Sequence, residues 1–351
     1  MLRRATFIVI LGLLACGVCA PAEAPAPLYP VKFFDFFAEE QPVRLAYRDV
    51  HPTAKPNGET VLLFHGEDFS GSCWEKTAQR LASDGFRVVV PDQLGFGAST
   101  RPNIHYSFHQ MAENTYRLLS YLNVREVEVV GHSMGGMLAV RFTLLYPATV
   151  RKLVLEDPIG LEDYRTFLPY VPLENEMHIN MHANYDTFLE RHKTFYVTWK
   201  PEYEVYAKEE AQLLDTGDFP QAALSTAIVF EMIYQQPVVY ELPEIQAPTL
   251  LVIGAEDRPV VGAMIGLAER PANMPGKDAS TMMPQDNNIV HTAGKMPGEY
   301  TKLFGQYQEL AQKAHEAIKN STLVRIPNAG HIPHIETPEQ FNQAVIPFLQ
   351  P

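Results

Sequence analysis

Apolar runs alternate with helical patterns along most of the chain. Ser72 and Glu75 have the spacing of a capping box at the start of one predicted helix. Five runs are continuous and rich in β-branched residues, as is typical of strands buried on both faces of a sheet: TVLLFHG, FRVVVPD, VEVVGHS, RKLVLED and PTLLVIGAED. Strands that alternate with helices predict an α/β fold with a mostly parallel, doubly wound sheet.

Two segments depart from this alternation. Residues 158–243 are rich in Tyr, Phe, Met and Pro and contain helical patches, which predicts a helical cap inserted between two strands. Residues 259–299 are rich in Met, Pro and Gly and predict a long irregular loop. We therefore divide the chain into a leader (1–22), a core in two parts (23–157 and 244–351) and the cap between those parts.

The N-terminus has the order of a secretory signal peptide. Arg3 and Arg4 precede an apolar stretch, and Ala20, Pro21 and Ala22 supply the small residues of a cleavage site. This order predicts an exported protein, either periplasmic or secreted.

A competing interpretation of the leader is a lipoprotein signal that ends at Cys16, which would carry a lipid anchor. With a cleaved signal peptide, Cys16 and Cys19 are removed and Cys73 is the single cysteine of the mature chain. No disulfide within the mature chain is therefore expected.

Composition and charge narrow the class of partner. The 351 residues are 46% hydrophobic and 20% charged, as in an ordinary globular protein. A net charge of −13, without a cluster of Lys and Arg, argues against a nucleic-acid partner. Beyond the leader, no apolar stretch reaches the roughly 20 residues that a membrane-spanning helix needs. The expected partner is a small molecule, and the sequence makes no prediction of the oligomeric state.

The strongest chemical signal is the stretch VEVVGHSMGGML, which contains Gly131-His132-Ser133-Met134-Gly135. This G-x-S-x-G pattern lies directly between a buried strand and a helical pattern. In that context it holds a serine on a tight turn and directs the hydroxyl into the site. The pattern predicts that Ser133 is a nucleophile. The alternative is a serine that merely caps the helix.

The chain resembles the α/β-hydrolases that carry a helical cap, from about Val31 to Leu349. The resemblance rests on five motifs in the family's order: LLFHG at 62–66, PDQLGFGAS at 91–99, GHSMGG at 131–136, LLVIGAEDRPV at 250–260 and IPNAGHIPHIETPEQFNQAVIPFL at 326–349. It implies the α/β-hydrolase fold, with an eight-stranded sheet and the cap beside it. It also implies a Ser-His-Asp triad.

Within that triad, the resemblance implies that the base is His331, which follows Ala-Gly after the last predicted strand. A serine needs such a base within hydrogen-bond reach before it can attack a carbonyl. The competing histidines are His334, His65 and His132.

The implied acid is Asp257 in GAEDRPV, with Glu256 as its solvated neighbour. Its role is to hold the imidazole tautomer and to stabilise the imidazolium. The alternative acids follow the preceding strand and are Glu156 and Asp157.

The oxyanion hole is expected from the backbone N–H groups of Met134 and Glu67. Family members usually have an apolar or small residue where this chain has Glu67. The acidic side chain leaves the role of the backbone unchanged. Together with Asp68 it suggests an entrance that disfavours anionic substrates.

A serine nucleophile argues against the chemistry of haloalkane dehalogenases and epoxide hydrolases, which use an aspartate. The predicted reaction is hydrolysis of a carboxylic ester, including a lactone, through an acyl-enzyme. One alternative is cleavage of a carbon–carbon bond in a diketone. A second is aminopeptidase activity, although such relatives usually carry Trp where this chain has Met134. A third is a catalytically silent ligand-binding protein.

No cofactor and no metal are expected. His178, His182 and His192 have a spacing that suits metal ligands, but no carboxylate at characteristic spacing completes the set, so we interpret them as polar residues of the cap. Aromatic residues of the cap suggest an apolar pocket. The residues expected to contact substrate are His65, Trp199, Phe230 and Tyr234.

Overall fold

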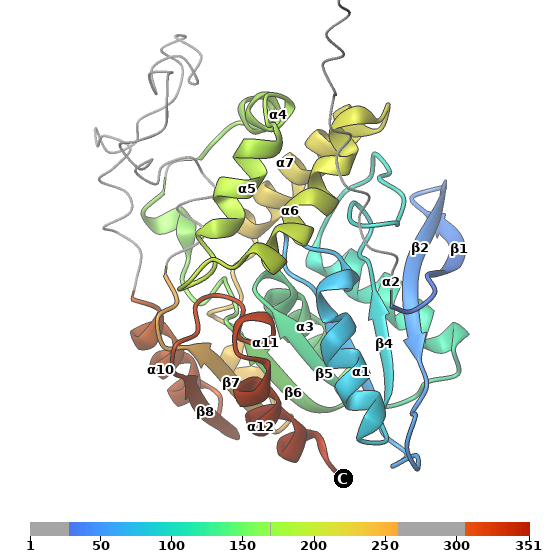
Figure 1. Cartoon of the computed structure of the whole chain (residues 1–351), viewed down its shortest axis with the longest axis vertical. Coiled ribbons are helices and arrows are strands. Elements are labelled where there is room, and N and C mark those ends of the chain that lie inside the picture. Colours follow the sequence, from blue (N-terminus) through green and yellow to red (C-terminus); the bar gives the residue numbers. More distant parts are fainter. Residues whose placement is uncertain (1–27, 169, 259–305) are drawn as a thin grey trace, which may run out of the picture.

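The computed structural model describes residues 28–168, 170–258 and 306–351. An eight-stranded sheet forms its centre, in the order β1-β2-β4-β3-β5-β6-β7-β8 (Figure 1). β2 runs antiparallel to both of its neighbours, β1 and β4, and the other neighbouring pairs of described strands are parallel. The strands are β1 (Lys32–Ala38), β2 (Gln41–Val50), β3 (Thr60–Phe64), β4 (Arg87–Pro91), β5 (Val127–His132), β6 (Val150–Glu156), β7 (Thr249–Gly254) and β8 (Ser321–Ile326). The prediction of an α/β fold with a mostly parallel eight-stranded sheet is confirmed.

The central strands are buried along their whole length. Every residue of β5 and of β7 is buried, which explains why these strands appear in the sequence as continuous apolar runs. The edge strand β1 has exposed positions because one side of it faces solvent.

Helices cover both faces of the sheet (Figure 1). On one face α1 contacts α12, and on the other α2 packs against α3, which lies over the central strands. The helices of the core are α1 (Glu75–Ser83), α2 (Phe108–Tyr121), α3 (Met134–Leu145), α10 (Tyr307–Ala317), α11 (Pro333–Glu336) and α12 (Pro338–Leu349).

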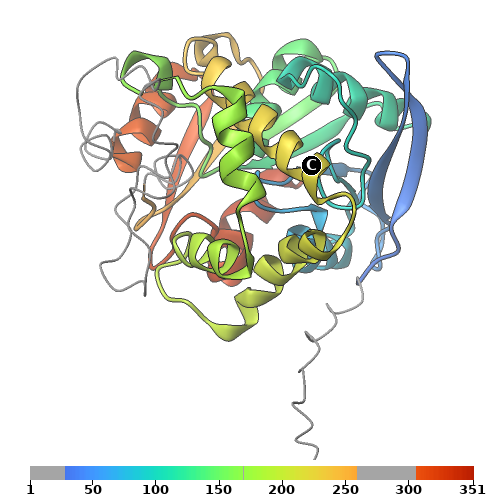
Figure 2. The same ribbon diagram turned by 90° about the horizontal axis from the view of Figure 1, so that it is seen from above.

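The segment between β6 and β7 is helical, and it lies over the end of the sheet to which the parallel strands run (Figures 1 and 2). Its helices are α4 (Leu173–Met181), α5 (Tyr185–Lys193), α6 (Glu204–Ala211) and α7 (Phe219–Gln235). Short 3₁₀ helices complete the described elements: η1 (Gly71–Trp74), η2 (Tyr164–Thr166), η3 (Pro201–Tyr203), η4 (Gln212–Asp215) and η5 (Leu242–Glu244). Because loops at the carboxyl ends of parallel strands carry function, the cap lies where a substrate would be enclosed.

The predicted capping box at the start of α1 is wrong. The Ser72 hydroxyl donates to Glu209 of the cap at 2.5 Å, and the Glu75 carboxylate accepts from Arg48 at 3.3 Å. Both side chains are therefore engaged in contacts distant in sequence. Ser70, two residues earlier, caps η1 instead.

Two predicted segments, the leader 1–22 and the irregular loop 259–299, lie outside the described residues. Within the described ranges, none of the helices combines the length and the apolar character needed to cross a bilayer.

Candidate active site

Ser133 occupies a sharp turn between β5 and α3. Its φ of 55° and ψ of −120° lie in a region that non-glycine residues rarely adopt. The flanking glycines permit this turn. A Cβ on Gly131 would lie 2.2 Å from the carbonyl oxygen of Gly135, and a Cβ on Gly135 would lie 2.4 Å from the carbonyl oxygen of Phe64. The sequence G-x-S-x-G is therefore a steric requirement of this close strand-to-helix packing.

Ser133, His331 and Asp257 form a continuous chain of hydrogen bonds. The Ser133 hydroxyl is 2.9 Å from Nε2 of His331, and Nδ1 of His331 is 3.0 Å from Oδ2 of Asp257. In the tautomer with hydrogen on Nδ1, His331 donates to the Asp257 carboxylate and accepts the serine proton. The histidine and aspartate side chains are 3% and 1% exposed, so this ion pair is shielded from solvent.

Asp157, the alternative acid, lies beside Asp257 at the end of β6. Its carboxylate accepts from the backbone N–H of Gly254 at 3.0 Å. Oxygen atoms of both aspartates and a nitrogen of His331 lie within 4.8 Å of one another, a spacing that would also suit metal ligands. Burial and the charge of Asp257 raise the pKa of Asp157 well above its usual value. The raised pKa favours the protonated form of Asp157, and among the described carboxylates only Asp257 bonds the His331 ring directly.

The loop that carries His331 is held from three sides. The backbone N–H of His331 donates to the carbonyl of Phe195 in the cap at 2.8 Å. Nε2 of His132 lies 2.8 Å from the His331 carbonyl and donates to it. Burial, with the adjacent His331 and His334, lowers the pKa of His132 well below its usual value, so His132 acts as a neutral donor. Glu336 accepts from the backbone N–H of Gly330 at 2.8 Å.

Glu156 anchors the chain just after the histidine. Its carboxylate accepts from the backbone N–H and from Nδ1 of His334, both at 2.8 Å. The His334 ring stacks on Trp74 with a centroid distance of 3.9 Å. Glu156 and His334, two of the sequence-predicted alternatives, therefore pair with each other and support the loop of His331.

The predicted oxyanion donors lie on either side of the nucleophile. Met134 is the first residue of α3, where a backbone N–H has no partner within the helix. Among the described residues the N–H of Glu67 donates to no protein acceptor. Gly66 packs against Ser133, since a Cβ added there would lie 3.2 Å from the serine Cβ. Two backbone N–H groups therefore have no protein acceptor among the described residues, one on the residue after Ser133 and one on the residue after Gly66.

His65 holds the turn before Glu67 in place. Its Nδ1 donates to the carbonyl of Gly66 at 2.8 Å, and its Nε2 accepts from the N–H of Gln93 at 3.0 Å. The ring is fully buried, and burial lowers its pKa. Since both ring nitrogens have protein partners, the position supports a structural role and gives no support to the predicted contact with substrate.

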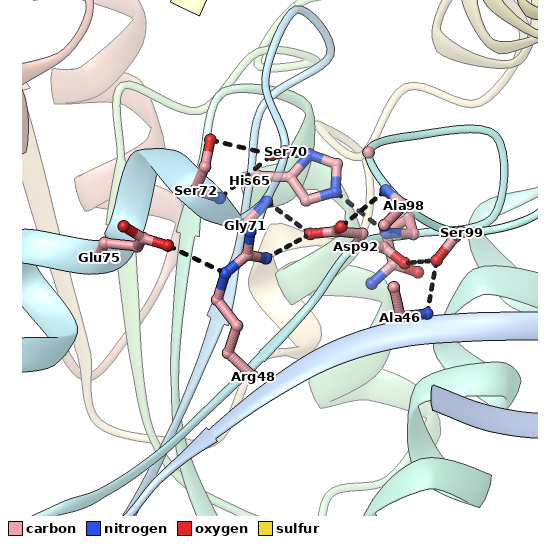
Figure 3. Close-up of polar contacts among 12 residues, drawn as sticks. Ala46, Arg48, His65, Ser70, Gly71, Ser72, Glu75, Asp92, Ala98 and Ser99 are labelled. Atoms are coloured by element: carbon pink, nitrogen blue, oxygen red, sulfur yellow. Dashed lines mark hydrogen bonds and ion pairs between the residues drawn. The ribbon is translucent and has the colours of Figure 1, made fainter. Parts of the chain in front are cut away.

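A buried network at the end of β4 supports the same turn (Figure 3). The Asp92 carboxylate accepts from Arg48 at 2.9 Å, from the N–H of Gly71 at 2.8 Å and from the N–H of Ala98 at 3.0 Å. The Ser99 hydroxyl donates to the Asp92 carbonyl at 2.6 Å. The PDQLGFGAS motif thus fixes the neighbouring turns that contain residues 65–71 and 92–99.

The three aromatic residues predicted to contact substrate are engaged with the protein. Trp199 packs edge-on against Tyr196, with ring centroids 5.5 Å apart. Phe230 is buried within α7, and the Tyr234 hydroxyl donates to the carbonyl of Leu168 at 3.1 Å. A cavity of about 400 Å³ lies between the cap and the core, and none of the three aromatic residues is among the described residues that line it. Their role as substrate contacts stays a prediction.

Comparison with known proteins agrees with this geometry. The sequence model of the alpha/beta hydrolase fold matches residues 59–273. A probable hydrolytic enzyme from Pseudomonas aeruginosa PAO1 is similar in structure, with a TM-score of 0.80 and 36% identity over 93% of this chain and 96% of that one. An esterase from Exiguobacterium antarcticum has a TM-score of 0.63 at 19% identity, over 88% of this chain and 96% of that one, and shows the fold alone.

Curated relatives match over shorter stretches. An uncharacterized protein of Mycobacterium tuberculosis is 35% identical over 34% of this chain, and the match spans only 36% of that relative's length. Lipase 1 of Psychrobacter immobilis is 27% identical over 61% of this chain and 67% of its own. The family match and the full-length structural likeness lead to one conclusion: the chain belongs to the alpha/beta hydrolase fold family.

Proposed function

We propose that the protein is a serine hydrolase that cleaves a carboxylic ester, including a lactone, through an acyl-enzyme. The observation that carries the proposal is the unbroken hydrogen-bond chain from Ser133 through His331 to Asp257. A serine needs both partners, one to take its proton and one to orient and stabilise the imidazole.

In the proposed first step Ser133 Oγ attacks the ester carbonyl while its proton passes to Nε2 of His331. The oxyanion accepts hydrogen bonds from the N–H groups of Met134 and Glu67. The imidazolium, stabilised by Asp257, then gives its proton to the departing alcohol. The acyl-serine remains.

Water completes the cycle by the same route. His331 removes a proton from water, hydroxide adds to the acyl carbonyl, and the second tetrahedral intermediate collapses to a carboxylic acid and free Ser133. The proton held on His331 returns to the serine oxygen. The step consumes one water for each ester and needs no redox partner.

Ester hydrolysis is favoured over the other chemistries of the fold by two points. The nucleophile is a serine, as acyl transfer to water requires, and the lipase of Psychrobacter immobilis is among the similar proteins. Cleavage of a carbon–carbon bond would use the same three residues and is retained as an arm of the test.

Hydrolysis of p-nitrophenyl esters of rising chain length, with lactones and a diketone alongside, tests the proposal. The wild-type protein should hydrolyse at least one ester, and Ser133→Ala should abolish turnover. Ser120→Ala, which removes an exposed serine hydroxyl of α2, is the control and should leave the rate unchanged. Turnover that survives in Ser133→Ala would refute the proposal, and activity confined to the diketone would replace ester cleavage by carbon–carbon cleavage.

A further inference from the structure

A cavity of about 400 Å³ lies between the cap and the core, and Glu67 is one of its lining residues. Core residues 67–70 and 95–98 form one wall, and residues of α4, α5, α6 and α7 form the other. Gly66, which packs against Ser133, directly precedes the first wall. The cavity is therefore positioned to hold the part of a substrate that extends away from the scissile bond.

Carboxyl groups outnumber guanidinium groups among the charged residues that line the cavity. Arg191 is engaged by two carboxylates, since it lies 2.9 Å from Asp68 and also bonds Glu210. Arg101 donates to the backbone carbonyl of Gly97 at 3.0 Å. The charged residues that line the cavity are Glu67, Asp68, Glu209 and Glu210 against Arg101 and Arg191. The excess of carboxyl groups disfavours an anion and favours a cation.

The Glu67 side chain has no partner. It is 8% exposed, forms no ion pair or hydrogen bond with another described residue, and leaves a buried, unpaired Oε2. Glu176, on α4 of the cap, is 4% exposed and also leaves a buried carboxyl oxygen unpaired. A buried polar group without a partner is unfavourable, and an arriving ligand that pairs with it removes that penalty.

The electrostatic surroundings of Glu67 also favour a cationic partner for its carboxyl group. Burial and then the charge of Asp68 raise the pKa of Glu67 well above its usual value, Glu176 and Glu210 add to the effect, and Arg191 opposes it. Burial raises the pKa of Glu176 to about 7. A cation in the cavity would stabilise the ionised form of both carboxyl groups.

Aromatic rings supply the rest of the wall. Phe96, Phe188, Tyr206 and Phe219 line the cavity, and the faces of such rings attract cations. The guanidinium of Arg191 already lies 5.3 Å from the centroid of Phe188. The lining thus combines the unpaired carboxyl group of Glu67 with aromatic rings, and this combination suits an ammonium group with an apolar stem.

We propose that this cavity binds a positively charged group of the substrate against the Glu67 carboxyl, so that the substrates are esters that carry an ammonium group. The proposal rests on ester hydrolysis at Ser133 as proposed above. In it Glu67 has two separate roles, because its backbone N–H faces the oxyanion while its side chain determines specificity. A neutral polar group paired with protonated Glu67 is the competing occupant.

Two esters of the same shape separate these occupants. Ethyl 4-(trimethylammonio)butyrate carries a quaternary cation, and ethyl 5,5-dimethylhexanoate replaces its nitrogen by carbon. Calorimetric titration of the Ser133→Ala protein measures binding without turnover. The charged ester should bind at least about 10-fold more tightly, as a partly desolvated charge–charge contact provides. Equal affinity, or tighter binding of the neutral ester, would overturn the proposal.

Matched substitutions identify the carboxyl group. Added to Ser133→Ala, Glu67→Gln should reduce the preference for the charged ester to less than about twofold. Glu190→Gln makes the same chemical change on α5, where Glu190 pairs with Lys193 at 2.6 Å outside the cavity, and should keep the preference. A preference that persists in Glu67→Gln would contradict the assignment.

A pH series serves if Glu67→Gln fails to fold. Affinity of the Ser133→Ala protein for the charged ester should rise as the pH rises, because the ionised Glu67 carboxylate attracts the cation and the protonated carboxyl group does not. Affinity that is constant or falls with pH would count against the cation. Hydrolysis by the wild-type protein is scored separately, so binding of the charged ester without hydrolysis of either ester would refute only the esterase proposal.

Discussion

Replacement of Asp257 by asparagine tests the proposed acid and its neighbour Asp157 together. The substitution keeps the size of the side chain and removes a negative charge 3.0 Å from Nδ1 of His331. Burial and then the charge of Asp257 raise the pKa of Asp157, so the substitution lowers that pKa while the effect of burial remains. An ionised Asp157 would lie within 4.8 Å of the imidazole.

These distances set the size of the expected loss. At an effective dielectric constant of about 20, attraction between unit charges is worth about 5.5 kcal/mol at 3.0 Å and about 3.5 kcal/mol at 4.8 Å. An ionised Asp157 would therefore limit the loss in Asp257→Asn to about 2 kcal/mol of imidazolium stabilisation, which is about 30-fold in kcat. With both aspartates replaced neither carboxyl group is left beside His331, and the loss should approach about 10⁴-fold, as in a triad without its acid.

The assay is kcat for a p-nitrophenyl ester in Asp257→Asn, in Asp157→Asn and in the double variant. Glu256→Gln, an exposed neighbour in the same turn, is the control and should keep the wild-type rate. Equal losses in Asp257→Asn and the double variant would show that Asp157 does not substitute. A wild-type rate in Asp257→Asn would refute the assignment of the acid.

Two further predictions concern stability, measured by urea unfolding. Burial, with Glu59 nearby, raises the pKa of Glu128 from 4.5 to about 7, so the native state retains a proton that the unfolded state releases, and stability falls as the pH rises between these values. The shift corresponds to up to about 3 kcal/mol, and solvent screening around the partly exposed Arg151 reduces this to about 1–2 kcal/mol. Glu128→Gln should therefore be more stable than the wild type by about 1–2 kcal/mol at pH 8 and equally stable below about pH 4. A variant that is less stable at pH 8 would contradict this. His334→Phe keeps a ring on Trp74 but removes the side-chain partner of the buried Glu156 carboxylate, which keeps only the backbone N–H of residue 334, and should cost about 3–5 kcal/mol. A cost below about 1 kcal/mol would show that this pair does not stabilise the fold.

The fold and the three proposed catalytic residues were predictable because their signals are local. Continuous apolar runs identify β5 and β7; Ser133 follows β5 directly, and Asp257 lies in the turn after β7. The glycines beside Ser133 reflect a steric limit that any sequence with this turn must meet. Resemblance to the family then selected His331.

The supports of the site were not predictable, because they join residues far apart in the chain. Glu156 and His334 are 178 residues apart and pair through the packed core. Arg191 of the cap pairs with Asp68 of the core, and nothing in the sequence near either residue indicates the other. Glu336 accepts from the backbone N–H of Val197, 139 residues away in the cap, at 2.8 Å.

The contacts of the aromatic residues in the cap were not predictable for the same reason. Trp199, Phe230 and Tyr234 have a composition that suits a pocket, yet each packs against or hydrogen-bonds to protein groups. The cavity is instead bordered by Glu67, whose side chain the sequence identified only as a departure from the family pattern. Burial and pairing, which distinguish these cases, arise from tertiary structure.

Covalent labelling of the folded protein by a fluorophosphonate tests the central proposal most directly. The reagent phosphonylates a serine only where a base and an oxyanion hole activate it. Peptide mass analysis should find one label, on Ser133, and the label should be absent in Ser133→Ala and slowed in His331→Ala. Folded wild-type protein that stays unlabelled, or that carries the label on another serine, would contradict the proposal that Ser133 is the nucleophile.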